Sequence, residues 1–425
     1  LAESVLDGRG FAWGKGFTAT RTPAYPLFVA FAYALPLPNV WSLLILQNII
    51  ASLAAVLLFK IGERLFSARA GLIAGIIYMI EPYMLMTANL ATTETFFNFV
   101  LIAFAYFFLQ WYSCANIRTA NTNIRITNNT QLVMSAVLLG IATLTRPAAL
   151  YAPGVVIILL IIRWIYKTES WKWFIKNSIL FVAVFTATLS PWMIRQYARF
   201  GTPRITNIDA VMLYLKAAPL AVAAERGVSY DEATQILWQR LKDQFPGAGP
   251  GDEYTDFRMY AYMVTEAKEL LSRHKAAIFK SYAVSFVPAL FGTGYEYMVE
   301  EVFDVPRTSK RISYSGAWVE RGLGGLLQEF RRPDIFQIIL FGGIVVWMAV
   351  YGSILFFISS KKTWQEHFLA IFFLLGFTAY FILITLGPAQ HARYRMPTFP
   401  FLFLLLAAAL DFLARVHYHR RRTGS

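Results

Sequence analysis

Apolar stretches close to twenty residues long recur along the chain, and they constrain its fold more than any other feature. The clearest examples are 40–59, 96–111, 179–193, 335–358, 368–386 and 397–413. A helix of about twenty apolar residues crosses the roughly 30 Å hydrocarbon core of a bilayer. Only 15% of the 425 residues are charged, which is too few for a soluble protein of this length. We therefore predict an all-α fold, a polytopic transmembrane helical bundle.

The net charge of +14 does not indicate a nucleic-acid partner. The basic residues lie in short loops and in the C-terminal tail between apolar spans, which is the distribution typical of cytoplasmic loops. The single cysteine, Cys114, excludes an intramolecular disulfide and a cysteine-cluster metal site. No group of His, Cys and Asp has metal-ligand spacing. We expect no required cofactor, and a divalent metal is not indicated.

Charge also predicts the topology. Basic segments at 60–69, 115–130, 163–176, 359–366 and 415–425 fall on alternate sides of successive spans, as expected if they face the cytoplasm. The predicted spans are 40–60, 71–88, 95–113, 131–146, 148–165, 177–197, 335–358, 367–386 and 397–414. The protein is then a multi-pass protein of the cytoplasmic membrane, with its C-terminus in the cytoplasm.

Three regions follow from these spans. Residues 1–197 form an N-terminal transmembrane module, residues 198–334 a non-cytoplasmic loop region that is partly helical, and residues 335–425 the C-terminal helices with a basic tail. In the loop region, helices are predicted at 231–244, with a capping start at Ser229, and at 256–274. The apolar segment 26–35 is too short to span and is predicted to be a re-entrant or interfacial piece. The segment 278–291, which contains Pro288, is predicted to lie at the membrane interface.

Four polar clusters fall on the non-cytoplasmic side under this topology, although the topology was derived without them. That coincidence predicts one shared site. The clusters are RTPAYP with Arg21 and Tyr25, TTET with Glu94, SPWMIRQY with Arg195, and QHARYRMP with His391, Arg393, Tyr394 and Arg395.

Each of these residues has a structural and a functional interpretation. Glu94 opens a span, so its carboxylate can cap the helix, or it can be a functional acid facing a polar cavity, because carboxylates at membrane depth are rare. Arginines at helix ends can snorkel to the headgroups, or a group of them on the side where few are expected can bind a phosphate. His391 can act as a base, although a lone loop histidine usually does not. Glu81 is interpreted as a helix-end residue.

In these clusters the chain resembles the polytopic GT-C glycosyltransferases. It is most similar to the bacterial branch related to dolichyl-phosphate-mannose protein mannosyltransferases and lipid A sugar transferases. The pieces that carry the resemblance are LAESVLDGRGF, RTPAYPLFVA, ATTETFFNFVL, LGIATLTRPAALY, SPWMIRQYARFG and ARYRMPTFPFLFLLLA, in this order. The resemblance implies an enzyme that moves one sugar, with inversion, from a polyprenyl-phosphate donor to an acceptor at the outer face of the membrane.

The resemblance also implies roles for particular residues. Glu94 matches the family's second outer acid, Arg21 a basic residue of the proline-rich motif, and Arg393 and Arg395 the basic pair that faces the donor phosphate. Some relatives carry an acid where Thr20 stands, so the resemblance does not imply a metal there. The family's principal catalytic Asp would fall upstream of Leu1, together with a first helix. The sugar and the acceptor (lipid, glycan or protein) are not specified.

Two other functions remain open from the sequence. A transporter or flippase of a lipid-linked or anionic solute would also gather outer arginines, but it is expected to contain inverted repeats and broken helices at mid-membrane, and the sequence shows neither. A non-catalytic, truncated relative that uses the same fold for binding is the second alternative, because the expected catalytic Asp is not within the sequence.

Overall fold

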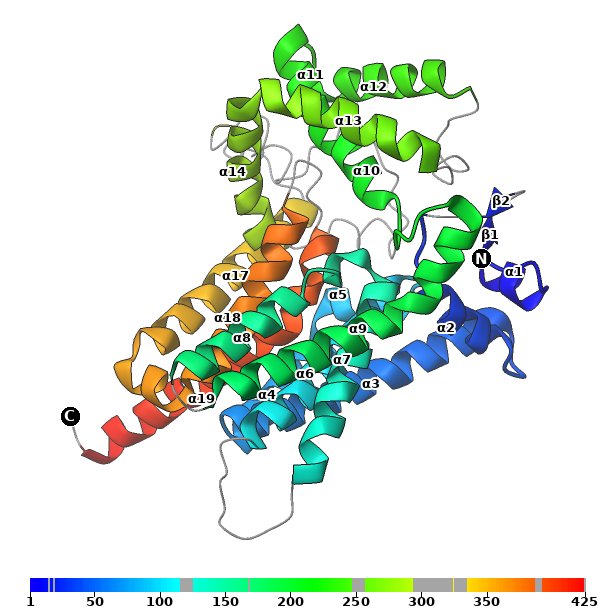
Figure 1. Cartoon of the computed structure of the whole chain (residues 1–425). Helices are drawn as coiled ribbons and strands as arrows, with labels where there is room; N and C mark the ends of the chain where they lie inside the picture. Colours follow the sequence, from blue (N-terminus) through cyan, green and yellow to red (C-terminus); the bar gives the residue numbers. More distant parts are fainter. Residues whose placement is uncertain are drawn as a thin grey trace.

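The structure is a computed structural model that describes residues 1–13, 16–17, 20–114, 125–166, 169–246, 257–292, 324, 335–386 and 392–423. The described part is helical apart from one antiparallel pair of two-residue strands, β1 (Ala12–Trp13) and β2 (Gly16–Phe17). Long helices lie side by side in one bundle, and shorter helices stand over one end of it (Figure 1). The predicted all-α transmembrane fold is confirmed.

Most of the described helices belong to the bundle. Seven helices are long and apolar enough to cross a membrane, and one bent pair makes an eighth candidate span, so the chain is a multi-pass membrane protein. The elements of this part are α1 (Ala2–Leu6), α2 (Ala24–Tyr33), α3 (Asn39–Leu65), α4 (Ala68–Ile80), α5 (Pro82–Ala88), α6 (Thr93–Cys114), α7 (Arg125–Thr145), η1 (Pro147–Ala149), α8 (Pro153–Ile165), α9 (Trp171–Phe200), α17 (Ile335–Ser359), α18 (Lys361–Thr385), η3 (Ala392–Thr398) and α19 (Phe399–Thr423).

Two of the nine predicted spans differ from simple crossings. The span predicted at 71–88 is broken by 61° between α4 and α5. Pro82 begins α5, and the Glu81 side chain accepts a hydrogen bond from the Met84 amide at 2.8 Å. A proline cannot continue the hydrogen-bond ladder of the preceding helix, and Glu81 caps the new one, as its helix-end interpretation predicted. The span predicted at 131–146 lies on α7, whose apolar part is shorter than the seven candidates.

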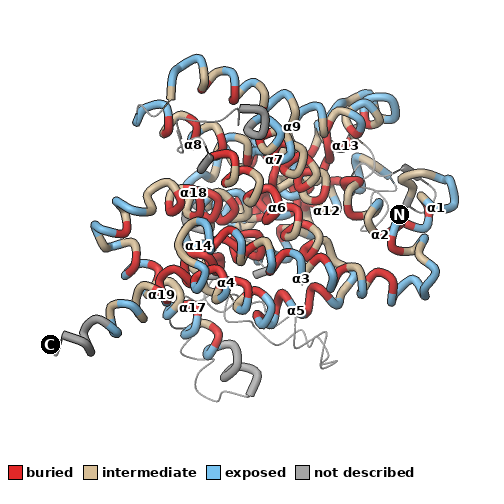
Figure 2. The backbone as a smooth tube through the Cα atoms, turned by 90° about the horizontal axis from the view of Figure 1, so that it is seen from below, coloured by how far each residue is buried: buried red, intermediate tan, exposed pale blue. Residues whose placement is uncertain are grey.

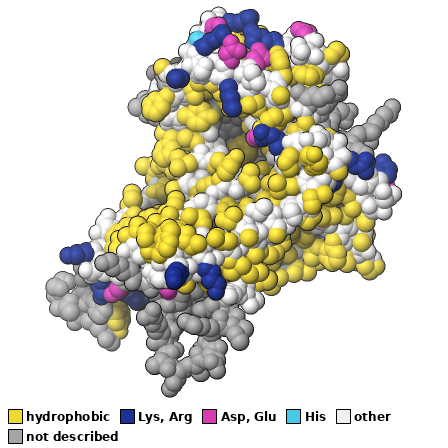
Figure 3. All heavy atoms as spheres, viewed as in Figure 1, with side chains coloured by type: hydrophobic (Ala, Val, Ile, Leu, Met, Phe, Trp, Pro, Cys, Tyr) yellow, Lys and Arg dark blue, Asp and Glu magenta, His cyan; other side chains and the backbone are white. Residues whose placement is uncertain are grey.

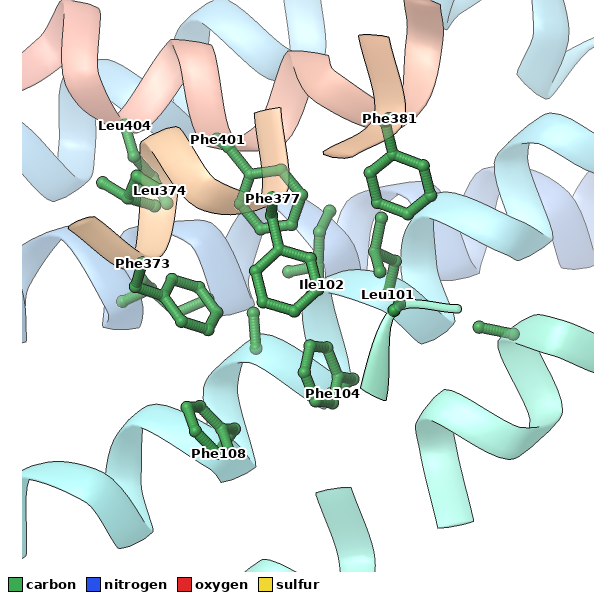
Figure 4. Packing of buried hydrophobic residues seen from close by; sticks show 14 of the residues in the cluster. Leu101, Ile102, Phe104, Phe108, Phe373, Leu374, Phe377, Phe381, Phe401 and Leu404 are labelled. Carbon is green, nitrogen blue, oxygen red and sulfur yellow. The ribbon is translucent and has the colours of Figure 1, made fainter. Parts of the chain in front are cut away.

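The core of the bundle surrounds α6, the most enclosed of the candidate spans. Aromatic and aliphatic side chains of α6 pack against α18 and α19, as Figure 4 shows for Phe104, Phe377 and Phe401. Buried residues concentrate in the middle of the bundle, and exposed ones follow its outer surface (Figure 2). Many of those exposed side chains are large and apolar, such as Ile45 and Leu355. This is the distribution expected when lipid is the solvent.

Helices α3 and α4 approach each other closely because glycines meet at their crossing. A Cβ atom added at Gly71 would lie 2.3 Å from the carbonyl oxygen of Phe59, and one added at Gly62 would lie 2.6 Å from the Gly71 Cα. Small residues at a crossing let two membrane helices pack backbone against backbone. The position of α4, and through it the start of α5, therefore depends on these two glycines.

The shorter helices over one end form an extramembrane unit with its own core. Its elements are α10 (Ile208–Met212), the π-helical turn Leu213–Ala217, α11 (Ala218–Arg226), α12 (Tyr230–Gln244), α13 (Phe257–Arg273) and α14 (Lys275–Phe291). The predicted helices at 231–244 and 256–274 are confirmed, and Ser229 and Glu232 form a reciprocal capping box at the start of α12.

A polar network in this unit joins α12, α13 and the π-helical turn. Glu266 accepts hydrogen bonds from Arg240 at 2.7 Å and from Tyr214 at 2.9 Å. Burial by itself raises the pKa of the Glu266 carboxyl. The hydrogen bonds from Tyr262, Arg240 and Tyr214 outweigh burial and hold this pKa below its usual range.

The opposite end of the bundle gathers the basic segments. Asp411 of α19 accepts a hydrogen bond from Ser67 at 2.8 Å and forms ion pairs with Arg69 and Arg415. Tyr166, at the end of α8, contacts Phe368 of α18. The turns after α3, α8 and α17 and the end of α19 thus lie at one end, as the alternation of predicted spans requires. The chain between 115 and 124 lies outside the described residues.

Candidate functional site

A buried ion pair marks the end of the bundle next to the extramembrane unit. Glu94 lies in the first turn of α6, and its side chain is 1% exposed. Arg146, whose side chain is 15% exposed, donates a hydrogen bond from Nη1 to Glu94 Oε1 at 3.0 Å. Two opposite charges at this distance attract each other. The positive end of the α6 dipole also attracts the carboxylate.

The local sequence explains why Arg146 reaches Glu94. Arg146 precedes Pro147, and its backbone is extended, with φ −141° and ψ 120°. The helical conformation is disfavoured for a residue before proline, and α7 ends at Thr145, so Arg146 lies just beyond the end of the helix. The guanidinium lies 5.8 Å from the centre of the Phe97 ring, one turn into α6. The arginine therefore bridges the end of one span and the start of another.

Helix α18, in the C-terminal half of the chain, holds the turn that carries Arg146. Tyr380 of α18 donates a hydrogen bond to the Ala148 carbonyl at 2.6 Å and accepts one from the Tyr151 amide at 3.1 Å. A hydroxyl that is both donor and acceptor fixes the two ends of the η1 turn to one helix. Tyr380 is thus a positioning residue for Arg146.

The N-terminal cluster joins the same end of the bundle. Thr22 donates a hydrogen bond to the Thr145 carbonyl, next to Arg146, at 3.1 Å. Thr206 donates to the Thr20 carbonyl at 2.8 Å. Arg21 lies between these two anchored threonines, and its side chain is exposed. The structure therefore places a solvent-facing cation on a fixed backbone segment beside the Glu94–Arg146 pair.

Tyr25 and Gln47 hold the segment that leads into α6. Its buried hydroxyl donates to Gln47 Oε1 at 3.1 Å, and Gln47 Nε2 donates to the carbonyls of Ala88 and Leu90 at 3.1 and 2.8 Å. These carbonyls belong to the segment that leads from α5 into α6. Tyr25 is predicted to bind substrate, and its hydroxyl also contacts the groups that position the start of α6.

Arg195 links the N-terminal segment to α9. Its guanidinium donates to Gln196 Oε1 at 2.9 Å and to the Phe11 carbonyl at 3.3 Å. It also lies 4.6 Å from the centre of the Trp192 ring, a distance at which a cation and an aromatic face attract each other. Trp192 itself packs edge-to-face against Phe11.

The last predicted cluster lies on η3. The Arg395 side chain is 1% exposed, donates a hydrogen bond to the Leu290 carbonyl and lies 4.1 Å from the centre of the Trp347 ring. Tyr394 is half-buried. The His391 residue and the side chain of Arg393 lie outside the described residues. Because η3 contacts both α6 and α18, Arg395 belongs to the same end of the bundle as Glu94, with its guanidinium directed to α14 and α17.

The convergence of the four clusters on one pocket stays a prediction, and the ion-pair partner that the structure gives Glu94 comes from outside them. Glu94 is paired with Arg146, which the sequence interpretation placed in a turn and did not select. A sequence signal for Arg146 was present, since it is a charged residue directly before a proline at the end of an apolar span. In the part of the chain that the structure describes, no group of three or more His, Cys, Asp and Glu side chains could hold a metal ion.

Several solved structures are similar to this chain. Among solved structures, the chain is similar to ArnT from Cupriavidus metallidurans bound to undecaprenyl phosphate, with 12% identity and a TM-score of 0.48 over 96% of this chain and 54% of that one. It is also similar to the archaeal oligosaccharyltransferase AglB from Archaeoglobus fulgidus in complex with an inhibitory peptide and a dolichol-phosphate. There the identity is 12% and the TM-score 0.48, over 96% of this chain and 44% of that one. The chain thus spans about half the length of each.

Comparison with protein families gives a match to part of the chain. A comparison with curated proteins finds none that matches this sequence. Residues 20–194 match the family described as dolichyl-phosphate-mannose-protein mannosyltransferase, and this range contains Arg21, Tyr25, Glu94 and Arg146. The resemblance read from the sequence pieces is confirmed over residues 20–194, the part of the chain that matches this family.

Proposed function

We propose that this protein is a membrane glycosyltransferase that transfers a sugar from a polyprenyl-phosphate donor to an acceptor hydroxyl, with inversion. The observation that carries the proposal is the buried Glu94–Arg146 pair, which lies inside the family match and beside the exposed Arg21. The name of the family supplies the donor class, a sugar on a lipid phosphate. A carboxylate and several guanidiniums at one end of a membrane bundle are the groups that this reaction needs.

The proposed reaction is a single displacement. The acceptor oxygen attacks the anomeric carbon of the sugar, the bond from that carbon to the phosphate oxygen breaks, and the polyprenyl phosphate leaves with the electron pair. The acceptor hydroxyl loses its proton to a carboxylate base. Within this chain we assign Glu94 to that role. Glu94 is the catalytic carboxylate proposed for residues 1–425.

The arginines are proposed to stabilise the donor phosphate. Negative charge grows on the departing phosphate, and fixed cations stabilise it most strongly where little water is present. Arg21, with its exposed side chain on an anchored segment, is proposed to contact the donor phosphate. Arg393, Arg395, Tyr394 and His391 on or next to η3 remain proposed contributors, because η3 lies against α6. Arg146 is proposed to orient the carboxylate of Glu94.

The orientation is part of the same proposal. The basic turns after α3 and α8 and the tail of α19 gather at the end of the bundle opposite Glu94. The positive-inside rule assigns that end to the cytoplasm. Glu94, Arg146 and the extramembrane unit would then face the periplasmic or extracellular side of the cytoplasmic membrane.

The test is a transfer assay with the protein in lipid nanodiscs. Radiolabelled undecaprenyl-phosphate sugars are supplied as donors, and sugar transfer or release is measured. We expect Glu94→Gln to lower the rate by about 10²–10⁴-fold, the usual contribution of a general base. Glu81→Gln is the matched control, because Glu81 is also a buried acid at the start of a helix and glutamine keeps an oxygen for the Met84 amide. Equal rates in wild type and Glu94→Gln would refute the assignment of Glu94.

A further inference from the structure

Two arginines at the basic end of the bundle, opposite Glu94, lie beside one buried carboxylate. The Asp411 side chain on α19 is 7% exposed, and its Oδ2 accepts hydrogen bonds from Ser67 Oγ at 2.8 Å and from Arg415 Nη2 at 2.5 Å. Arg69 Nε lies 3.8 Å from Asp411 Oδ1, which is too long for a hydrogen bond. A single carboxylate therefore faces a pair of guanidiniums, and positive charge is in excess.

The position of Arg69 in its helix adds to this excess. Arg69 is in the first turn of α4, which the Ser67 hydroxyl caps by accepting a hydrogen bond from the Ala70 amide at 3.0 Å. The N-terminal end of a helix carries a partial positive charge, so a cation in the first turn is unfavourable unless an anion lies close to it. Asp411 is engaged more closely by Ser67 and Arg415. A further anion beside Arg69 would be attracted by the helix end and by both guanidiniums.

Both arginine side chains are accessible from outside the bundle. Arg69 is 64% exposed and Arg415 is 60% exposed, whereas the carboxylate between them is buried. A guanidinium carries several N–H donors in a fixed fork, and the contact with Asp411 engages only part of each fork. The carboxylate therefore fixes two cations in position and leaves donors of both for another acceptor.

An exposed apolar strip on α4 runs from Arg69 into the membrane. Leu72, Ile76 and Ile80 follow it at intervals of three, four and four residues, so they lie on the same face of the helix. Their side chains are 55%, 50% and 64% exposed. At a rise of about 1.5 Å per residue, the strip from Arg69 to Ile80 is about 16 Å long. This is close to half of the roughly 30 Å hydrocarbon core, the depth of one leaflet.

The charge and the strip together select a class of ligand. Charged side chains lie at the ends of the bundle, and hydrophobic side chains cover the surface between them (Figure 3). A cation at one end, at the level of the lipid headgroups, needs no ligand by itself. Two fixed cations above an apolar strip fit a molecule that has an anionic group and a chain one leaflet long. An anionic phospholipid has both, and its phosphate accepts forked hydrogen bonds from arginine.

We propose that Arg69 and Arg415 bind the phosphate of an anionic phospholipid, and that an acyl chain of this lipid lies along the exposed strip of α4. This binding does not depend on the proposed transferase activity. A zwitterionic phospholipid carries the same phosphate, but the two arginines repel its attached cation. Because the Ser67–Asp411 hydrogen bond joins α4 to α19, the lipid phosphate would hold the same junction from the membrane side.

The test measures lipid binding to the full chain by native mass spectrometry. The protein is released from detergent micelles that contain a known amount of dioleoylphosphatidylglycerol or dioleoylphosphatidylcholine. We expect phosphatidylglycerol to bind more tightly than phosphatidylcholine. Arg69→Gln and Arg415→Gln, measured separately, are each expected to weaken phosphatidylglycerol binding about fivefold, which corresponds to about 1 kcal/mol per basic residue near anionic lipid. Inorganic phosphate, the third ligand, is expected not to displace the lipid, because it has no chain.

The matched control is Lys362→Gln. Lys362 is also in the first turn of a helix, α18, at the same end of the bundle, where His367 of α18 contacts Phe66. It lies 3.9 Å from Glu366, but this acid is 54% exposed and belongs to the same helix. We expect its removal to leave phosphatidylglycerol binding unchanged. Thermal unfolding in phosphatidylcholine checks that each variant is folded, as expected for side chains that are more than half exposed.

Four results would overturn the proposal. The first is phosphatidylcholine binding as tightly as phosphatidylglycerol, and the second is wild-type affinity in either arginine variant. The third is an equal loss of binding in Lys362→Gln, which would show that the lipid responds only to the total charge. The fourth is displacement of the lipid by inorganic phosphate, which would identify a site for the free ion.

Discussion

The ion pair between Arg146 and Glu94 should be one of the strongest single interactions in this protein. The charged atoms are 3.0 Å apart, and the side chains are 15% and 1% exposed. With an effective dielectric constant near 20, Coulomb's law gives a gross attraction of about 5–6 kcal/mol at this distance. Desolvation offsets part of it. However, removing one partner leaves the other charge buried, and such changes destabilise proteins by about 3–5 kcal/mol.

This reasoning predicts a specific double-mutant cycle. Arg146→Met is expected to lower the free energy of unfolding by about 3–5 kcal/mol, because it keeps an unbranched apolar stem and removes the charge. In Glu94→Gln/Arg146→Met no buried charge remains. We therefore expect the double variant to lose at least about 2 kcal/mol less than the sum of the two single losses, within the range seen for directly contacting residues.

The measurement is reversible unfolding in lipid bicelles by steric trapping, which reports free energies for membrane proteins. The matched control is Arg69→Met, because Arg69 lies 3.8 Å from Asp411 but is 64% exposed, and exposed pairs contribute only about 0–1 kcal/mol. Additive losses in the Glu94 and Arg146 variants, with a coupling below about 0.5 kcal/mol, would show that the two side chains are not paired and would refute the reasoning.

Two further predictions concern the scaffold. Gly71→Ala is expected to destabilise the protein by about 1–3 kcal/mol or more, because the added Cβ meets the Phe59 carbonyl. Gly154→Ala, where the Cβ meets nothing within 4 Å, should be neutral or stabilising by up to about 1 kcal/mol; equal thermal stabilities of these two variants would contradict the close α3–α4 crossing. The pKa of Glu266 is lowered in the folded protein, so its stabilising contribution is present above the ordinary glutamate pKa of about 4.3 and is lost as the pH falls through the lower folded value. The protection of α13 amides from hydrogen exchange, relative to their intrinsic exchange rates, should fall over this acidic range in the wild type and not in Glu266→Gln, and the same fall in both would exclude Glu266 as its cause.

Local sequence determined the helices and many of their boundaries. Apolar length predicted the membrane spans, because the bilayer requires every backbone group to be bonded within its own helix. Ser229 and Pro147 predicted a helix start and a tight turn, since capping and the conformational restriction before proline act within a few residues. Charge in the turns predicted which helix ends lie together, and the basic segments of the described chain do gather at one end.

The partners of the site residues were decided by the tertiary structure. Glu94 and Arg146 are 52 positions apart, Arg395 and Leu290 are 105 apart, and Tyr380 and Ala148 are 232 apart. The sequence shows which charged residues lie near one membrane face, because that depends only on span length and loop charge. Which arginine pairs with the carboxylate depends on how α6, α7 and α18 cross one another. That crossing is set by the packing of aromatic side chains from distant segments, and no local pattern encodes it.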